Sequence, residues 1–322
     1  MKMSDLEAAA EAVRNARNLA LACHVGPDGD ALGSMLALGV AARRRDIEVV
    51  ASFGSPYVVP ENLSFLPTDM LTPPGDFPDE PETMVVFDAG SAERLGELAV
   101  NAKAATRLIV IDHHATNEGF GDIAVIDGSA AATGELVYEL LGLLGWEVDS
   151  VVATCLLTAL VTDTGRFMYT NTTAKTLRIA ARLVEAGARP PEVSRHVYET
   201  APFGYLKAAA AALARSSLDA GLGIVTAVLT DEDLDDAGIG WDDTDGLIDT
   251  LRLADEADVA VLAKVHDDGR VKVSLRSRGA TDVGSLAARM GGGGHRLAAG
   301  FTVEQDPESV LEEVRRTIGE YR

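Results

Sequence analysis

The chain reads Leu108-Ile109-Val110-Ile111-Asp112-His113-His114 near its centre, an apolar run followed at once by three side chains suited to metal binding. A short run rich in β-branched residues predicts a buried strand. A second such run, Met84-Val85-Val86-Phe87, also ends in an acid, Asp88. Because the carboxyl ends of parallel strands meet at one edge of an open α/β sheet, the two runs predict a ligand site at that edge.

The sequence around these runs alternates between strand and helix patterns. We expect strands at 19–23, 47–52, 84–87 and 108–111, and helices at 5–18, 31–45, 91–100, 133–144 and 173–186. The apolar run 151–162 could be a buried helix or a long strand, and we favour the helix. Seven prolines between positions 56 and 81 predict irregular structure there. The alternation is typical of a parallel sheet with helices on its faces.

The pattern changes after Arg189-Pro190-Pro191. Two helices are expected at 191–200 and 203–217, followed by strands from 223 and at 258–265, 270–276 and 300–304, with helices at 282–289 and 308–320. We therefore predict an α/β fold in three parts: a parallel-sheet domain with flanking helices at 1–188, a helical connector at 189–221 and a smaller α/β domain at 222–322.

The charge of the chain limits its partners. Its 322 residues include 50 acidic and 28 basic side chains, a formal net charge of −22. Such a surface repels a long phosphate backbone, so a nucleic-acid partner should be short and bound at one local patch. The N-terminus lacks the pattern of a secretory signal, and no apolar run is long enough to span a bilayer. We expect a cytoplasmic protein without a membrane partner, whose cysteines, Cys23 and Cys155, are reduced core thiols.

Side chains suited to metal binding recur where apolar segments end. The candidates are His24, Asp28, Asp30, Asp88, His113 and Asp163. Carboxylates gathered at one place repel one another unless cations lie between them. Oxygen ligands mixed with a few imidazoles favour Mn²⁺ or Mg²⁺ over a thiolate-type zinc site. Six ligands exceed what one such ion takes from a protein, so two ions that share a carboxylate, clamp a phosphoryl group and supply a hydroxide fit better.

Some of these acids have a simpler explanation. An isolated Asp after a strand is more often a helix cap than a ligand, and Asp30 and Asp88 could each be only that. Adjacent histidines, His113 and His114, directly after a buried strand are harder to explain in this way. Taken together, the stretches favour a metal site.

A glycine run forms the second distinctive motif, Met290-Gly291-Gly292-Gly293-Gly294-His295. Such a run lets the backbone approach a phosphate and point several N–H groups at it, although it could also be a flexible loop. Between Lys264 and Arg296 there are seven basic residues against three acids. In a chain this acidic, that excess of positive charge is the natural place for an anion.

The motifs resemble those of a known superfamily. His24-x₃-Asp28-Gly29-Asp30, Asp88-Ala89-Gly90, Asp112-His113-His114 and Thr162-Asp163-Thr164-Gly165 resemble the four motifs of the DHH phosphoesterases. The segment Gly291 to His295, with Arg276-Ser277-Arg278, is similar to the accessory DHHA1 domain. The order and spacing resemble the short bacterial branch of nanoRNases and pAp (3′-phosphoadenosine-5′-phosphate) phosphatases, which includes cyclic dinucleotide phosphodiesterases.

The resemblance implies a role for each residue. His24, Asp28 and Asp88 would hold one Mn²⁺, and Asp30, Asp88, His113 and Asp163 the other, with Mg²⁺ or Co²⁺ as substitutes. His114 would face the substrate phosphate, and Asp112 would orient the two histidines. The residues implied for substrate binding are Arg276, Ser277, Arg278, Gly293, Gly294 and His295.

The implied activity is hydrolysis of short oligoribonucleotides, linear or cyclic di-AMP, and pAp by a hydroxide bridging the two metals, in a protein that forms a homodimer. A family II inorganic pyrophosphatase shares the metal motifs, but the glycine run counts against it. A RecJ-like exonuclease would need a long basic channel. A nucleotide-binding sensor without catalysis is the remaining alternative, and the complete ligand set argues against it.

Overall fold

The computed structural model describes residues 4–117, 119–244 and 246–320, and its chain divides into two compact units, Met1–Thr200 and Ala201–Arg322. The boundary falls inside the segment predicted as a connector, 189–221. Helix α7 (Pro190–Tyr198) belongs to the first unit, and α8 (Phe203–Ala214) belongs to the second.

The first unit is built on a five-stranded parallel sheet in the order β2-β1-β3-β4-β5. Its strands are β1 (Asn18–Cys23), β2 (Glu48–Phe53), β3 (Met84–Phe87), β4 (Leu108–Asp112) and β5 (Ile123–Ile126). The first four agree with the prediction. Strand β5 was not predicted, because its four residues lie at the sheet edge and only Val125 is fully buried.

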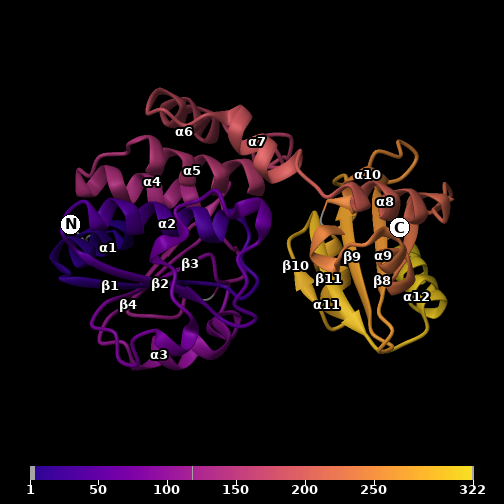
Figure 1. Ribbon diagram of the computed structural model, residues 1–322, viewed down its shortest axis with the longest axis horizontal. Coiled ribbons are helices and arrows are strands. Elements are labelled where there is room, and N and C mark those ends of the chain that lie inside the picture. Colours follow the sequence, from indigo (N-terminus) through magenta and orange to yellow (C-terminus); the bar gives the residue numbers. More distant parts are fainter. Residues whose placement is uncertain (1–3, 118, 245, 321–322) are drawn as a thin grey trace. The chain divides into compact units, whose positions relative to one another are not determined.

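Helices cover both faces of this sheet because side chains alternate along each strand (Figure 1). Leu21 and Phe87 pack on the face covered by α1 (Asp5–Asn15), α2 (Gly29–Arg43), α4 (Thr133–Leu144) and α5 (Ser150–Asp163). Ala22 and Val86 point to the other face, beneath α3 (Ala99–Ala104). Helix α6 (Ala174–Glu185) packs outside α5. The layers confirm the predicted α/β class.

Close packing of α2 on α5 brings their two acidic ends together. A Cβ atom on Gly33 would lie 2.4 Å from the carbonyl oxygen of Cys155, so only glycine permits this approach. Helix α2 begins where α5 ends, which places Asp30 beside Asp163. The run 151–162 is therefore helical, as favoured. Asp163 lies at the end of this helix rather than at the end of a strand.

Two regions depart from simple helix patterns. The helix predicted at 91–100 is instead a 3₁₀ segment, η4 (Ala92–Leu98), followed by α3. Gly96 adopts a left-handed φ of 59° that interrupts a regular α-helix. The proline-rich stretch contains only the short 3₁₀ turns η1 (Glu61–Leu63), η2 (Thr68–Met70) and η3 (Pro74–Asp76), in line with the irregular structure predicted there.

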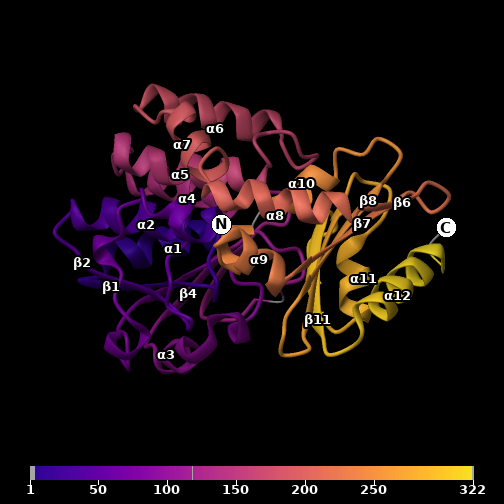
Figure 2. The ribbon, with the colours of Figure 1, turned by 45° about the vertical axis from the view of Figure 1, so that its right-hand side comes forward.

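The second unit holds a six-stranded mixed sheet in the order β10-β11-β9-β8-β7-β6. Its strands are β6 (Ser217–Asp219), β7 (Ile224–Thr230), β8 (Val259–Val265), β9 (Val271–Ser277), β10 (Gly293–Gly294) and β11 (Ala298–Val303). Helices α11 (Val283–Arg289) and α12 (Pro307–Glu320) cover one face, while α8, α9 (Asp231–Ala237) and α10 (Leu247–Leu251) cover the other (Figure 2). A 3₁₀ turn, η5 (Trp241–Thr244), precedes α10.

The elements of this unit that sequence patterns did not predict are all short, the longest being α9 with seven residues in an acidic stretch. Within the described ranges, no helix is long and apolar enough to cross a membrane.

Candidate functional site

The predicted metal-suited residues gather at the carboxyl edge of the first sheet. His24 directly follows β1, Asp88 follows β3, and His113 follows β4. The chain runs from β1 to β2 on one side of β1 and then crosses to β3 on its other side, so the order of the strands reverses between β1 and β3. Open α/β sheets bind ligands at such a topological switch point.

A first group of donor atoms surrounds His24. Its Nε2 lies 3.9 Å from Asp28 Oδ2 and 3.6 Å from Asp88 Oδ2. Its Nδ1 lies 3.0 Å from the carbonyl oxygen of Val25, which leaves Nε2 facing the carboxylates. Asp28 has a second role, because its Oδ1 accepts the backbone N–H groups of Asp30 and Ala31 at the start of α2. The helix cap is therefore Asp28, and the alternative that Asp30 serves only as the cap is wrong.

A second group surrounds His113. Its Nε2 lies 3.2 Å from Asp163 Oδ2, 3.7 Å from Asp30 Oδ2 and 3.6 Å from Asp88 Oδ1. Its Nδ1 lies 3.2 Å from the carbonyl oxygen of Ala130. Asp30 is fully buried and accepts hydrogen bonds from the Ser34 hydroxyl and from two backbone N–H groups at the start of α4.

Asp88 lies between the two groups. Its Oδ2 faces His24 and its Oδ1 faces His113. Its backbone is left-handed, with a φ of 53°, a conformation that Asp tolerates better than most residues. Its N–H donates to the carbonyl oxygen of Ile111 and so continues the pairing of β3 with β4. The alternative that Asp88 caps the helix near Ser91 is wrong, since that segment has no side-chain cap.

The donor atoms of each group fit a metal ion. Ligand atoms of His24, Asp28 and Asp88 lie within 4.8 Å of one another, and so do those of Asp30, His113 and Asp163. Asp88 adjoins the second set through Oδ1, which lies 3.6 Å from His113 Nε2. The separations of 3.2–3.9 Å between imidazole nitrogens and carboxylate oxygens are mostly too long for direct hydrogen bonds. They suit an ion about 2.0–2.4 Å from each ligand atom. Carboxylate oxygens with imidazole are ligands that Mn²⁺ and Mg²⁺ accept.

The electrostatics of the site also demand positive charge. Burial, with Asp88 and Asp163 nearby, raises the pKa of Asp30 well above its usual range. Burial also raises the pKa of Asp163 well above its usual range, and the nearby carboxylates of Asp28 and Asp88 add to the effect. Burial alone would lower the pKa of His24, but Asp28 and Asp88 outweigh it and raise that pKa to about 10. Asp30, Asp163 and His24 thus retain protons unless cations replace them.

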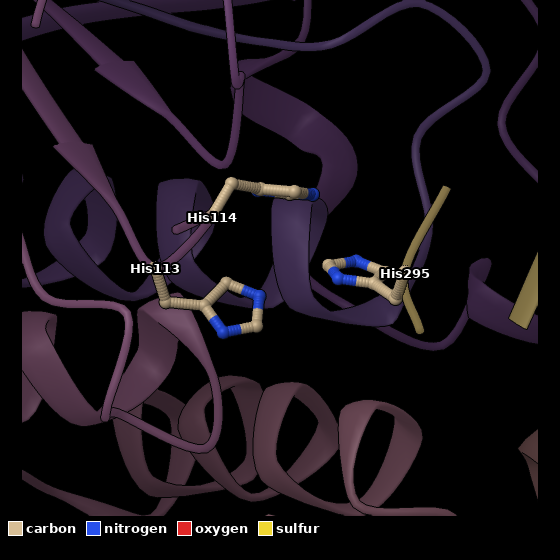
Figure 3. A group of neighbouring side chains, drawn as sticks. All are labelled: His113, His114 and His295. Carbon is tan, nitrogen blue, oxygen red and sulfur yellow. The ribbon is translucent and has the colours of Figure 1, made fainter. Parts of the chain in front are cut away.

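The neighbouring imidazole of His114 has different partners. Its Nδ1 lies 2.7 Å from Asp112 Oδ1, and Asn117 donates from Nδ2 to Asp112 Oδ2 at 2.6 Å. His113 and His114 are neighbours, as Figure 3 shows. Their ring planes are at 63°, and their ring centroids are 5.1 Å apart. Asp112, Asp88 and His114 also form a close group, but both oxygens of Asp112 accept hydrogen bonds. Asp112 thus contacts His114, one of the two histidines that it was predicted to orient, and the role itself stays a prediction.

In the second unit, the structure does not bring Arg276, Ser277 and Arg278 to one face. Arg276 is half-buried, whereas Ser277 follows it on β9 and so points to the opposite face, where it is 2% exposed. The Ser277 hydroxyl accepts the N–H of Gly279. Arg278 is exposed and contacts Asp255 and the carbonyl oxygen of Ala254.

Part of the glycine run forms a short strand. Gly293 and Gly294 form β10, which pairs with β11. Gly294 has a φ of 137°, which side chains rarely adopt. His295 follows on the surface, and its N–H donates to the carbonyl oxygen of Ala298. The four glycines thus present an exposed backbone that a ligand could approach.

Three residues at the first site were not singled out from the sequence: Thr133, Asn117 and Asn171. Thr133 donates to Asp88, Asn117 to Asp112, and Asn171 to the carbonyl oxygen of Asp163. Thr133 and Asn171 lie near helix starts, where Thr and Asn are common as caps, and Asn117 lies in the loop between β4 and β5, so none of the three carries a distinctive local signal.

Comparisons with known proteins agree with this geometry. The model of the DHH family, N-terminal domain, matches residues 18–165, and the model of the DHHA1 domain matches residues 221–321. The chain is 35% identical over 312 residues to the bifunctional oligoribonuclease and PAP phosphatase NrnA of Thermus thermophilus, covering 92% of this chain and 89% of that protein. The chain belongs to the DHH family.

Other relatives of this DHH protein extend the comparison. The Bacillus subtilis protein of the same description is 30% identical over 284 residues, 87% of either chain. The crystal structure of an exopolyphosphatase-related protein from Bacteroides fragilis superposes with a TM-score of 0.91 at 24% identity, covering 98% of this chain and 96% of that one, which shows the shared fold. The predicted family is confirmed, and the DHH protein is a hydrolase of phosphoester bonds.

Proposed function

We propose that this DHH protein hydrolyses short oligoribonucleotides and pAp to mononucleotides with two Mn²⁺ ions. The observation that carries the proposal is the position of Asp88, whose two carboxylate oxygens face different His/Asp groups. The substrate classes are those in the descriptions of its relatives from Thermus thermophilus and Bacillus subtilis. Linear and cyclic di-AMP are further candidates, because their nucleotides are joined by phosphodiester bonds, as in oligoribonucleotides.

The two groups divide the proposed ligands. His24 and Asp28 would hold one ion, Asp30, His113 and Asp163 the other, and Asp88 would be shared. When bound, such a pair lowers the pKa of a coordinated water and offsets the charge on the phosphoryl group. Mg²⁺ or Co²⁺ could substitute, because the donor set is carboxylate and imidazole.

The protein's own groups would orient the substrate. Asp112 holds His114 through Nδ1, so the opposite ring nitrogen can donate to a phosphate oxygen. Burial alone would lower the pKa of His114, but Asp112 and Asp88 raise it overall, which favours the charged imidazole that a phosphate prefers. Asp112 accepts hydrogen bonds from both His114 and Asn117, and these bonds fix the orientation of the His114 ring.

The second unit would bind the nucleotide. Exposed backbone at Gly293 and Gly294, with His295, Arg276 and Arg278, offers donors for phosphate. The buried Ser277 would support the turn at Gly279 rather than contact substrate. The net charge of −22 disfavours long nucleic acid. A homodimer and a cytoplasmic location stay predictions.

One assay tests the proposal. Purified protein with Mn²⁺ would be incubated with pAp, pApA, cyclic di-AMP, a longer RNA and pyrophosphate, and relative rates compared before and after chelation. We expect pAp or pApA to be the best substrates and chelation to stop turnover. Faster hydrolysis of pyrophosphate or long RNA would contradict the proposal, and no hydrolysis of any nucleotide would favour the sensor alternative.

A further inference from the structure

Thr133 is a fully buried residue that donates hydrogen bonds to two of the proposed ligands, Asp88 and Asp30. Its hydroxyl donates a hydrogen bond of 2.9 Å to Asp88 Oδ1, and its backbone N–H donates one of 2.6 Å to Asp30 Oδ2. The next N–H, from Gly134, donates to Asp30 Oδ1 at 2.9 Å. The start of α4 thus holds one carboxylate by its backbone and another by a single side chain.

The Thr133 hydroxyl does not stabilise its own helix. The residue before it, Ala132, is the N-cap of α4 and makes no side-chain cap. A threonine in the first turn can bond to backbone groups nearby, but the only hydrogen bond seen for this hydroxyl among the described residues is the one to Asp88, 45 positions away in the sequence. A role in helix capping therefore does not account for it.

The hydrogen bond from Thr133 restricts rotation of the Asp88 carboxylate. The backbone of Asp88 is set by its left-handed φ of 53° and by the hydrogen bond from its N–H to Ile111. Its carboxylate must then present Oδ2 to His24 and Oδ1 to His113, each at 3.6 Å. A donor bonded to Oδ1 alone distinguishes the two oxygens and opposes rotation that would turn both toward one group.

We propose that Thr133 is a positioning residue that fixes the Asp88 carboxylate in the orientation shared by the two metal groups. The inference rests on the proposed two-metal function. Hydrogen-bonding partners of metal ligands typically contribute about 10–100-fold to metal affinity or activity. Loss of the hydroxyl should therefore weaken binding of one of the two ions, while the backbone bonds to Asp30 persist.

The test compares three variants in the full-length protein. Thr133→Val keeps the shape and removes the hydroxyl, whereas Thr133→Ser keeps the hydroxyl. Thr158→Val is the matched control, because Thr158 is also 0% exposed but donates within α5 to the carbonyl oxygen of Thr154. Titration calorimetry would give the number and affinity of bound Mn²⁺ ions, and electron paramagnetic resonance would report exchange coupling between two Mn²⁺ ions.

We expect Thr133→Val to bind one equivalent of Mn²⁺ about 10–100-fold more weakly and to lose the exchange-coupled spectrum. Its kcat on pAp should fall with KM little changed. Thr133→Ser and Thr158→Val should resemble the wild type. If Thr133→Val does not fold, Thr133→Ala replaces it in the same comparison with Thr133→Ser.

Two results would overturn the inference. One is a Thr133→Val protein with the wild-type isotherm and spectrum, and the other is equal impairment of the Val and Ser variants, which would assign the effect to packing. Both presuppose a wild type that binds two Mn²⁺ ions. A wild type that binds fewer than two would instead contradict the proposed function itself.

Discussion

The side-chain amide of Asn171 donates a hydrogen bond of 3.0 Å to the backbone carbonyl oxygen of Asp163. The same amide donates one of 3.0 Å to the carbonyl oxygen of Ala131, in the segment that leads into α4. Asp163 is the last residue of α5, and the chain beyond it enters left-handed conformations at Arg166 and Phe167, which are costly for such side chains. Asn171 therefore ties this turn to the segment that contacts His113.

Replacing Asn171 by Ala should impair the second metal group. The change leaves two carbonyl oxygens without their donor, so we expect an activity loss of about 10–100-fold and weaker Mn²⁺ binding. Asn101→Ala is the matched control, because Asn101 donates to the carbonyl oxygen of Pro78 at 2.9 Å, away from the site. Steady-state kinetics would measure the activity of each variant, and metal titration its Mn²⁺ affinity. Equal activity and affinity in the two variants would refute a role for Asn171 at the metal site.

Asp88→Asn should abolish turnover while the protein still folds. The amide has the size of the carboxylate but lacks its charge and one acceptor oxygen. It therefore cannot present an oxygen to the His24 side and to the His113 side at once. We expect a loss of more than about a hundredfold in kcat. Circular dichroism would establish folding, and Mn²⁺-dependent activity close to the wild type would contradict the two-metal proposal.

Asp112→Asn should slow catalysis without removing metal. Asp112 accepts from His114 and Asn117, so an amide at this position loses an acceptor and the fixed orientation of His114. We expect kcat to fall by about 10–100-fold while the number of bound Mn²⁺ ions stays the same. A matching loss of metal would mean that Asp112 is itself a ligand.

Binding of Mn²⁺ should strengthen as the pH rises from about 6 to 8, because metal must displace protons from its ligands. The pKa of His24 is about 10, and those of Asp30 and Asp163 are raised by burial and nearby carboxylates. A group with a raised pKa stabilises the metal-free fold at low pH, and this contribution is lost as the pH rises. The increase in Tm on adding Mn²⁺ should therefore grow with pH, and a pH-independent increase would count against the site.

Two neighbouring glycines should respond differently to the same substitution. A Cβ on Gly292 would lie 2.1 Å from the carbonyl oxygen of Gly300, so Gly292→Ala should destabilise the second unit by about 1–3 kcal/mol. A Cβ on Gly293 meets no atom within 4 Å. Gly293→Ala should leave Tm unchanged and raise KM if nucleotide approaches this backbone. Thermal denaturation and kinetics would separate the two, and an unchanged KM would remove Gly293 from the proposed binding surface.

Local patterns were enough to predict much of the first unit. The apolar runs before Asp88 and Asp112 became β3 and β4, and strand topology then placed both acids at one sheet edge. Shorter or less regular elements escaped prediction. Strand β5 has only four residues, and Gly96 converts a helical pattern into a 3₁₀ segment through its left-handed backbone.

The sequence by itself determined the fold class, the family and the six metal-suited residues, because hydrophobic periodicity and motif spacing are local properties of the chain. Only the tertiary structure decided that Asp28 rather than Asp30 caps α2, that Ser277 is buried, and that Thr133 donates to Asp88. The physical reason is that a buried donor bonds to whichever acceptor packing brings within reach. That acceptor can lie far along the chain, where no local pattern records it.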